Sequence, residues 1–175
     1  MTLRTQEAAN LIIVVLAGAV LTLDQLTKFG LLNFLDLGQE REIIEGFFKF
    51  VHWGNTGAAW SLFSNNNRIL ALVSLAALAV LLLVRHHFDN GSVPGKVALG
   101  LLLGGILGNL ADRVFRGQVI DFLRFYIHQR GGDEIGFPAF NVADSAICIG
   151  VGLLFILSCQ KDDVPRSVPP AAQEN

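Results

Sequence analysis

Two isolated aspartates stand in apolar sequence in the second half of this 175-residue chain. Asp121 lies in the run VIDF and Asp144 in the run NVADSA. Two carboxylates at close range cannot both ionise cheaply, so such a pair shares one proton and titrates as a unit. One carboxylate can then take a proton from water while the other donates one, which suffices for peptide hydrolysis. The two aspartates are therefore candidate catalytic residues.

Other polar residues near the apolar runs have helical spacing. Asp24 and Lys28 are four positions apart in DQLTK, so they share a helix face and can form an ion pair that ends the first apolar run. Asn141 lies three positions before Asp144, so these two residues could share a helix face. The alternative for Asp144 is a structural role, as a residue favoured by the helix dipole at a helix N-terminus.

A third polar group ends the apolar stretch that contains GNLADR. Asn109, Asp112 and Arg113 lie at positions i, i+3 and i+4, and we expect them to form one polar patch. For Asp112 and Arg113 we favour a structural salt bridge over a chemical role. A ridge of glycines at steps of four precedes the patch and should let another helix approach closely. The ridge consists of Gly100, Gly104 and Gly108.

Motifs of other catalytic chemistries are absent from the sequence. It contains no GxSxG, no phosphate-binding glycine loop and no metal-ligand spacing among its four histidines. We therefore expect no metal and no cofactor. Proton-coupled transport, in which membrane carboxylates relay protons, is the alternative to hydrolysis. Four short helices without an inverted repeat fit a transporter less well, and a small channel stays open.

The elements that must position these residues are membrane helices. Apolar residues make up 52% of the chain and charged residues 16%, against about 25% charged in an average soluble domain. The net charge of −2 argues against nucleic-acid binding. Four segments are apolar on every face and near the roughly 20 residues that span a bilayer. They are Ala8–Leu23, Ile69–Val84, Val97–Ala111 and Ala143–Cys159.

This pattern predicts an all-α integral membrane protein with four transmembrane helices and both termini on one side. A cleavable signal peptide is the alternative for the first segment, but the small-residue triplet Ala17-Gly18-Ala19 lies inside the apolar run and not after it. We predict a single membrane-embedded domain over residues 1–160. A proline-rich tail, residues 161–175, is expected to be disordered.

Two long connections fall on the side opposite the termini. The first, residues 29–68, contains IIEGFFKFVHW, whose β-branched and aromatic residues are typical of short strands. Its aromatic residues can also lie at the lipid headgroups. The second, residues 113–140, contains HQRGGDEIGFPAF, which predicts an exposed loop with a glycine turn. Since Asp112, Asp121 and Asp144 all fall on this side, we predict a carboxylate-lined site at one end of the helices.

Five motifs, in order from Asp24 to about Gly150, resemble those of the lipoprotein signal peptidases, also called signal peptidase II. They are DQLTK, NTGAAWSLF, GNLADR, VIDF and FNVADS. The resemblance implies a bacterial intramembrane aspartic endopeptidase that removes the signal peptide of prolipoproteins, cutting before the cysteine that carries a diacylglyceryl group. It implies that Asp121 and Asp144 are the catalytic residues. It also implies site-supporting roles for Asp24, Asn55, Asn109, Asp112, Arg113 and Asn141.

Lys28 and Gly57 join this supporting set because they lie in the same motifs. Asn55, in the NTGAA turn, either bonds the substrate backbone or caps the turn, and Gly57 allows a close backbone approach. The first long connection could clamp the substrate peptide by adding strand contacts.

The resemblance also implies a location and partners. It places the chain in the bacterial inner membrane, with both termini in the cytoplasm and the site near the outer face. A raw count of Lys and Arg would place the termini outside, but most of the opposing basic residues lie in long segments that also carry acids. The expected partners are a diacylglyceryl-modified prolipoprotein and membrane lipids, not nucleic acid. The protein is expected to be a monomer and a target of globomycin.

Overall fold

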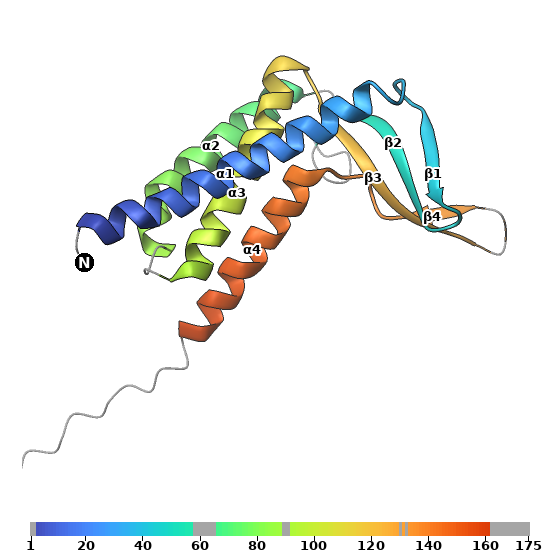
Figure 1. The fold of residues 1–175 in the computed structure, drawn as a ribbon. Helices are drawn as coiled ribbons and strands as arrows, with labels where there is room; N and C mark the ends of the chain where they lie inside the picture. Colours follow the sequence, from blue (N-terminus) through green and yellow to red (C-terminus); the bar gives the residue numbers. More distant parts are fainter. Residues whose placement is uncertain (1–2, 58–65, 89–91, 130, 132, 162–175) are drawn as a thin grey trace, which may run out of the picture.

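The structure, a computed structural model, describes residues 3–57, 66–88, 92–129, 131 and 133–161. Within these residues the chain forms helices packed side by side and one small antiparallel sheet (Figure 1). The predicted disordered tail lies almost entirely outside the described residues. In chain order the elements are α1 Leu3–Leu32, β1 Glu40–Ile44, β2 Phe48–Asn55, α2 Asn67–Phe88, α3 Val93–Phe115, β3 Val119–His128, β4 Glu134–Gly136 and α4 Val142–Lys161.

Three of the helices are long and apolar enough to cross a membrane. The qualifying stretches are Asn10–Leu32 of α1, Val93–Phe115 of α3 and Val142–Gln160 of α4. In α2 the apolar stretch is shorter, Asn67–Leu83. The chain is therefore an integral membrane protein. A helix forms at each of the four predicted segments, while the count of four spans stays a prediction.

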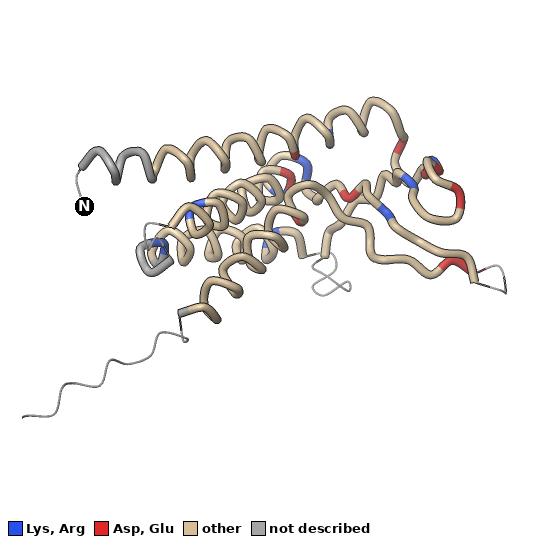
Figure 2. Tube along the Cα trace, turned by 60° about the horizontal axis from the view of Figure 1, so that its bottom comes forward, with Lys and Arg blue, Asp and Glu red and all other residues tan. Residues whose placement is uncertain are grey.

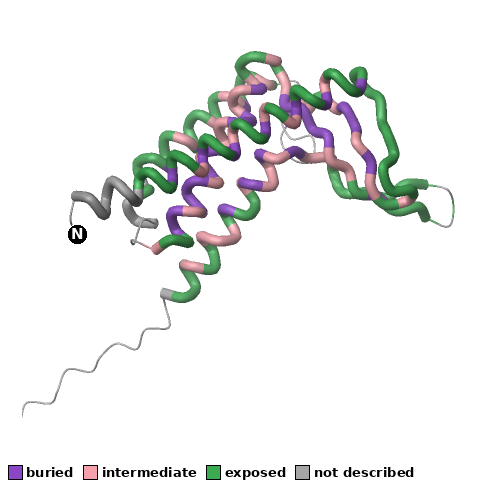
Figure 3. Tube along the Cα trace, viewed as in Figure 1, coloured by how far each residue is buried: buried purple, intermediate pink, exposed green. Residues whose placement is uncertain are grey.

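Helix α3 lies between α1 and α4, and glycines on two of its faces make this possible. A Cβ atom on Gly104 would lie 2.7 Å from the Ala17 carbonyl oxygen of α1. A Cβ atom on Gly105 would lie 2.5 Å from the Ala143 carbonyl oxygen of α4. Real Cβ atoms do not come this close, so only glycine permits both contacts. The predicted glycine ridge is confirmed, and α3 is accordingly rich in buried residues (Figure 3).

The sheet has the strand order β1-β2-β3-β4, with every neighbouring pair antiparallel. The two strands predicted in the first connection are present as β1 and β2. The second connection is not only a loop, because β3 pairs with β2 over much of its length and the short β4 pairs with β3. The β-branched and aromatic residues of VIDFLRFYIH are typical of a strand.

The sheet lies at one end of the helices. The first described residues of α1 and the last of α4 lie at the other end (Figure 1). Both long connections therefore emerge on the same side, as predicted. A cluster of buried apolar residues joins the end of α1 to β3, with Leu31 and Leu35 packed against Ile120 and Phe122. This cluster fixes the sheet against the helices next to the predicted site.

Candidate active site

Asn141 joins the two predicted catalytic aspartates. Its side-chain Nδ2 donates to Asp121 Oδ1 at 2.9 Å, while its backbone N–H donates to Asp144 Oδ2 at 3.2 Å. Asp121 projects from β3, and Asp144 lies in the first turn of α4. The structure thus brings together two residues that are 23 positions apart in sequence, at the junction of sheet and helices.

The start of α4 sets the position of Asp144. The Asn141 side-chain oxygen accepts a hydrogen bond from the Asp144 N–H at 2.9 Å, in return for the bond from its own N–H to the Asp144 carboxylate. This reciprocal pair is a capping box, which satisfies donors that a helix N-terminus otherwise leaves free. Both readings of Asp144 are therefore compatible. It shares a site with Asn141, and it also stabilises the first turn of α4.

Asn55 holds Asp121 from the other side. Its Nδ2 donates to Asp121 Oδ2 at 2.9 Å, and its Oδ1 accepts from the Gly57 N–H at 2.9 Å. Asn55 therefore caps the turn, which is one of the two roles that the sequence suggested for it. The same side chain orients a candidate catalytic carboxylate. The rest of the NTGAAWSLF motif, from residue 58 onward, lies outside the described residues.

Asn109 of α3 links Asp144 to a second set of charged residues. Its Nδ2 donates to Asp144 Oδ1 at 2.7 Å. Its Oδ1 accepts from Asn141 Nδ2 at 3.2 Å and from Lys28 Nζ at 3.3 Å. Because an amide presents donors and an acceptor at fixed positions, this contact set also fixes the orientation of the Asn109 amide.

Lys28 lies at the centre of a buried ion-pair network. Its Nζ is 2.8 Å from Asp24 Oδ2 and 2.7 Å from Asp112 Oδ2, and all three side chains are fully buried. The predicted Asp24–Lys28 pair is confirmed. The expectation that this pair ends the first helix is wrong, because α1 continues to Leu32. Figure 2 shows acidic and basic positions gathered at the end of the helices next to the sheet.

The network also holds the backbone on either side of the two aspartates. Asp24 Oδ1 accepts from the Ala143 N–H at 3.0 Å, one residue before Asp144. Asp112 Oδ2 accepts from the Ile120 N–H at 3.2 Å, one residue before Asp121. The buried carboxylates of α1 and α3 therefore anchor α4 and β3 beside the candidate catalytic residues.

The expected salt bridge between Asp112 and Arg113 is wrong. Among the described residues, the cations paired with Asp112 are Lys28 and Arg116. Adjacent residues of a helix do not face each other, whereas Arg116 lies one turn further on. Arg113 Nη1 instead donates to the Asn109 carbonyl oxygen at 3.3 Å.

Two residues of the network were not predicted. Gln25 Nε2 lies 3.1 Å from both Asp24 Oδ2 and Asp112 Oδ1, and Arg116 Nη1 donates to Gln25 Oε1 at 2.8 Å. The position of Arg116, four residues after Asp112, was an available signal for an ion pair. Nothing local in the sequence indicated that Gln25 contacts α3, since that contact depends on how the helices pack.

The environment of Asp121 favours its protonated form. Burial, and then the nearby charge of Asp144, raises the pKa of Asp121 to about 7. The hydrogen bonds from Asn55 and Asn141 and the charge of Lys28 oppose this effect. A carboxyl group with a pKa near neutrality can hold or release a proton at physiological pH, as acid–base catalysis requires.

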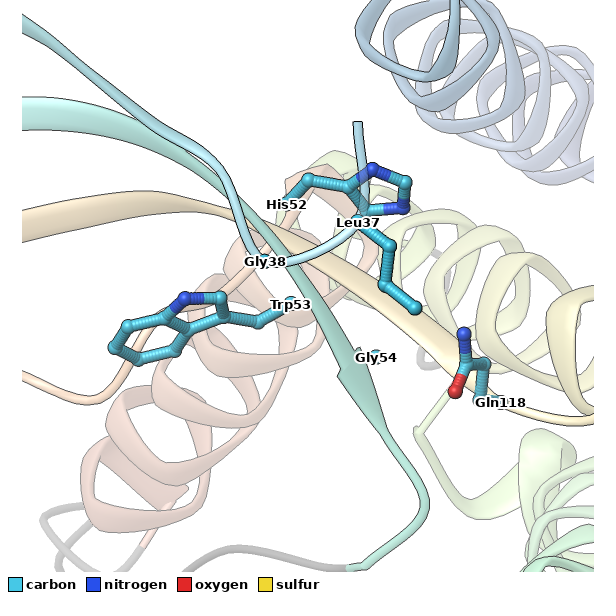
Figure 4. A pocket seen from close by; sticks show the side chains of 6 residues that line it. All are labelled: Leu37, Gly38, His52, Trp53, Gly54 and Gln118. Carbon is cyan, nitrogen blue, oxygen red and sulfur yellow. The ribbon is translucent and has the colours of Figure 1, made fainter. Parts of the chain in front are cut away.

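A groove of about 330 Å³ lies near the site without including either aspartate. It lies between β2, the turn before β1 and the turn before β3 (Figure 4). Trp53, one of its residues, is the direct β-sheet partner of Asp121. The end of the Gln118 side chain packs over Gly54, in space that a Cβ atom at position 54 would take. The groove is lined by Leu37, Gly38, His52, Trp53, Gly54 and Gln118.

A group with metal-ligand chemistry lies elsewhere, on the sheet. Potential ligand atoms of Glu42, His128 and Glu134 lie within 4.8 Å of one another, and all three residues are exposed. Glu134 is paired with Lys49, and Glu42 accepts a hydrogen bond from the Tyr126 hydroxyl. These acids are already engaged, and none contacts the two aspartates in the described part of the structure.

Comparison with known proteins decides the family. The pattern of the family described as signal peptidase (SPase) II matches residues 16–160. The chain belongs to the signal peptidase II family. Signal peptidase II enzymes are proteases, and the match covers every residue of the candidate site.

Individual relatives agree with the family. The signal peptidase II chain is 39% identical over 143 residues to the lipoprotein signal peptidase of Symbiobacterium thermophilum, covering 82% of this chain and 91% of the relative. It is 37% identical over 141 residues to the enzyme of the same name from Geobacillus kaustophilus, covering 81% and 88%. A solved bacterial membrane enzyme, 30% identical, superposes with a TM-score of 0.74 over 90% of this chain and 94% of that one.

Proposed function

We propose that this protein is an intramembrane aspartic endopeptidase that removes the signal peptide from diacylglyceryl-modified prolipoproteins. The family and the names of the relatives support the substrate class. The single observation that supports the mechanism is the double contact of Asn141, which donates to both aspartates from one residue. Such a bridge holds the two carboxylates near each other, and the charge of Asp144 helps to raise the pKa of Asp121, as expected of a pair that retains one proton.

In this mechanism the aspartates act as a pair. The ionised carboxylate takes a proton from a water molecule, which attacks the scissile carbonyl carbon. The protonated carboxyl donates a hydrogen bond to the carbonyl oxygen, and the proton then passes to the leaving amine. The pKa of about 7 at Asp121 fits a pair that retains one proton near neutral pH.

Arg113 is a further candidate for substrate binding. Its Nε is buried and has no hydrogen-bond partner within the described residues, and its charge interacts with those of Asp144 and Asp121. A buried donor without a partner is costly unless a ligand satisfies it. We infer that this guanidinium donates to a backbone carbonyl of the bound peptide, close to the bond that is cut.

The proposed location follows the position of the site. Asp121 belongs to β3 and Asp144 to the first turn of α4. These elements meet at the end of the molecule opposite the start of α1 and the end of α4 (Figure 1). We propose that four helices cross the inner membrane, that both termini are cytoplasmic and that a monomer presents the site near the outer face. The substrate's diacylglyceryl group would then stay in the membrane, between helices, during cleavage.

Mass spectrometry of the products tests the proposed substrate and bond. Purified protein in detergent should cut a diacylglyceryl-modified prolipoprotein immediately before the lipidated cysteine. The same precursor without the lipid should be cut far more slowly. Cleavage at another bond, or equal cleavage of both precursors, would show that the lipid does not define the substrate.

A further inference from the structure

In this sheet some polar side chains are buried and several large apolar side chains are exposed, which is the reverse of a sheet in water. Lys49 and Tyr126 are only 4% and 2% exposed. Ile127 and Phe137, in contrast, are 58% and 65% exposed. Soluble proteins rarely expose several large apolar side chains together, and rarely bury lysine unless it is paired. The arrangement therefore needs a surrounding other than water on the apolar side.

The buried polar residues have acidic partners on other strands. Lys49 Nζ lies 2.5 Å from Glu40 of β1 and 2.7 Å from Glu134 of β4. The Tyr126 hydroxyl of β3 donates to Glu42 of β1. The Lys49–Glu134 and Tyr126–Glu42 contacts link strands that are not direct neighbours, so they hold the charged sides of these strands together. Lys49 and Tyr126 therefore have partners for their polar groups, while Glu40, Glu42 and Glu134 stay exposed on the charged face.

The opposite face carries a continuous aromatic and aliphatic surface. The Phe125 ring lies 5.4 Å from the Phe47 ring and 6.0 Å from the Phe140 ring, centroid to centroid. Phe137 packs edge-on against Phe140 at 5.8 Å. We call this surface the outer face of the sheet. Its exposed large side chains are Ile44, Phe47, Phe125, Ile127, Ile135 and Phe137.

The outer face continues into a membrane-spanning helix. Phe140 contacts both Phe125 and Phe137 and lies two residues before the start of α4. The spanning stretch of α4 is mostly unburied within the protein and exposes Ile149 and Phe155. In Figure 1 the strands run at a steep angle to the helices, at the end where α4 begins. The sheet is thus placed to lie along the membrane surface.

We propose that the outer face lies in the headgroup and upper acyl region of the bilayer that the helices cross. Aromatic side chains are favoured at this depth. The surface is continuous with the lipid-facing side of α4, which favours lipid over a second copy of the chain as the occupant. The sheet then acts as a platform that fixes the depth of Asp121 relative to the membrane.

Spin labels at adjacent residues of β3 test this proposal. Cys148 and Cys159 are exposed, so both are first replaced by alanine. A nitroxide is then attached at Ile127→Cys on the outer face or at the matched control His128→Cys on the charged face. In lipid vesicles, collisions with oxygen should exceed those with a water-soluble nickel chelate several-fold at position 127. The order should reverse at position 128.

A third label at Phe137→Cys repeats the measurement on the outer face, should the Ile127 variant fail to fold. Dominant nickel collisions on the outer face would mean that this face lies in water, and would overturn the proposal. Exclusion of both reagents, with two copies found by sedimentation, would mean that protein covers it, and would also overturn it. No substrate is present, so the outcome does not depend on the proposed cleavage activity.

Discussion

At the scale of single residues, amide side chains organise the candidate site. Asn55, Asn109 and Asn141 each donate to one of the two aspartates at 2.7–2.9 Å through a side-chain nitrogen. A neutral amide can orient a carboxylate without adding a charge. The pair can therefore be held close together while burial keeps the pKa of Asp121 near 7. A lysine in the same position would favour ionisation of both carboxylates.

The first prediction concerns Asn55→Ala and pH. Activity needs one proton on the pair, so kcat/KM should fall as pH rises through about 7, where Asp121 loses its proton. The Asn55 bond stabilises the ionised carboxylate, so its loss raises the pKa of Asp121. The alkaline limb should move to higher pH by about one unit, since a bond to a charged group contributes about 1.5 kcal/mol. Asn33→Ala, at an exposed residue that bonds only locally to Phe29, is the control. If the alkaline limb of the Asn55→Ala profile stays in place or moves to lower pH, the prediction is wrong.

The second prediction concerns Lys28→Met. This change leaves Asp24 and Asp112 buried without their shared cation. Removing one partner of a buried ion pair typically destabilises a protein by about 3–5 kcal/mol. Thermal unfolding in detergent should show a large loss of stability, while Arg85→Met, at an exposed position of α2, should show little. Equal stability of the two variants would mean that the network does not hold α1, α3 and α4 together.

At the scale of elements, the contact of α1 with α3 sets the geometry of the site. Gly104 lets the helices approach, and the same contact places Asp24 where it can accept from Ala143 of α4. Separating α1 from α3 should therefore disturb the position of Asp144 as well as the packing. The site depends on residues that never touch the substrate.

The third prediction follows from this contact. In Gly104→Ala the new Cβ would lie 2.6 Å from the Val20 Cβ and must displace α1. Overpacking of this kind costs about 1–3 kcal/mol, and kcat/KM should fall with stability. Gly18→Ala in α1 is the matched control, because nothing lies within 4 Å of its added Cβ. Equal stability and equal kcat/KM of the two variants would contradict a role of Gly104 in close helix packing.

The elements also show what could be predicted from sequence. Uniformly apolar runs predicted all four helices, because a helix satisfies the backbone hydrogen bonds within a single apolar segment in a membrane. The glycine ridge predicted a close helix contact, because the spacing of small residues along one helix face is visible in the local sequence. The strand β3 was missed, because Asp121 and Arg124 interrupt its apolar pattern and VIDF was interpreted only as chemistry.

At the scale of the whole molecule, counting membrane crossings placed Asp112, Asp121 and Asp144 on one side, and the structure brings them to one end of the helices. The partners of Asp112 could not be predicted in this way. Lys28 is 84 positions away in sequence, and only helix packing brings the two together. The burial of Lys49 in β2 likewise depends on contacts with Glu40 of β1 and Glu134 of β4, which only the folded sheet brings together.

Cleavage of a diacylglyceryl-modified prolipoprotein by Asp121→Asn and Asp144→Asn tests the central claim most directly. Each variant keeps the shape of its side chain but cannot share a proton as a carboxylate does. Asp133→Asn, at an exposed residue of the sheet region, is the control. Both site variants should elute as folded protein and lose at least about 100-fold in kcat, while the control keeps its activity. Normal cleavage by either site variant would contradict catalysis by the aspartate pair.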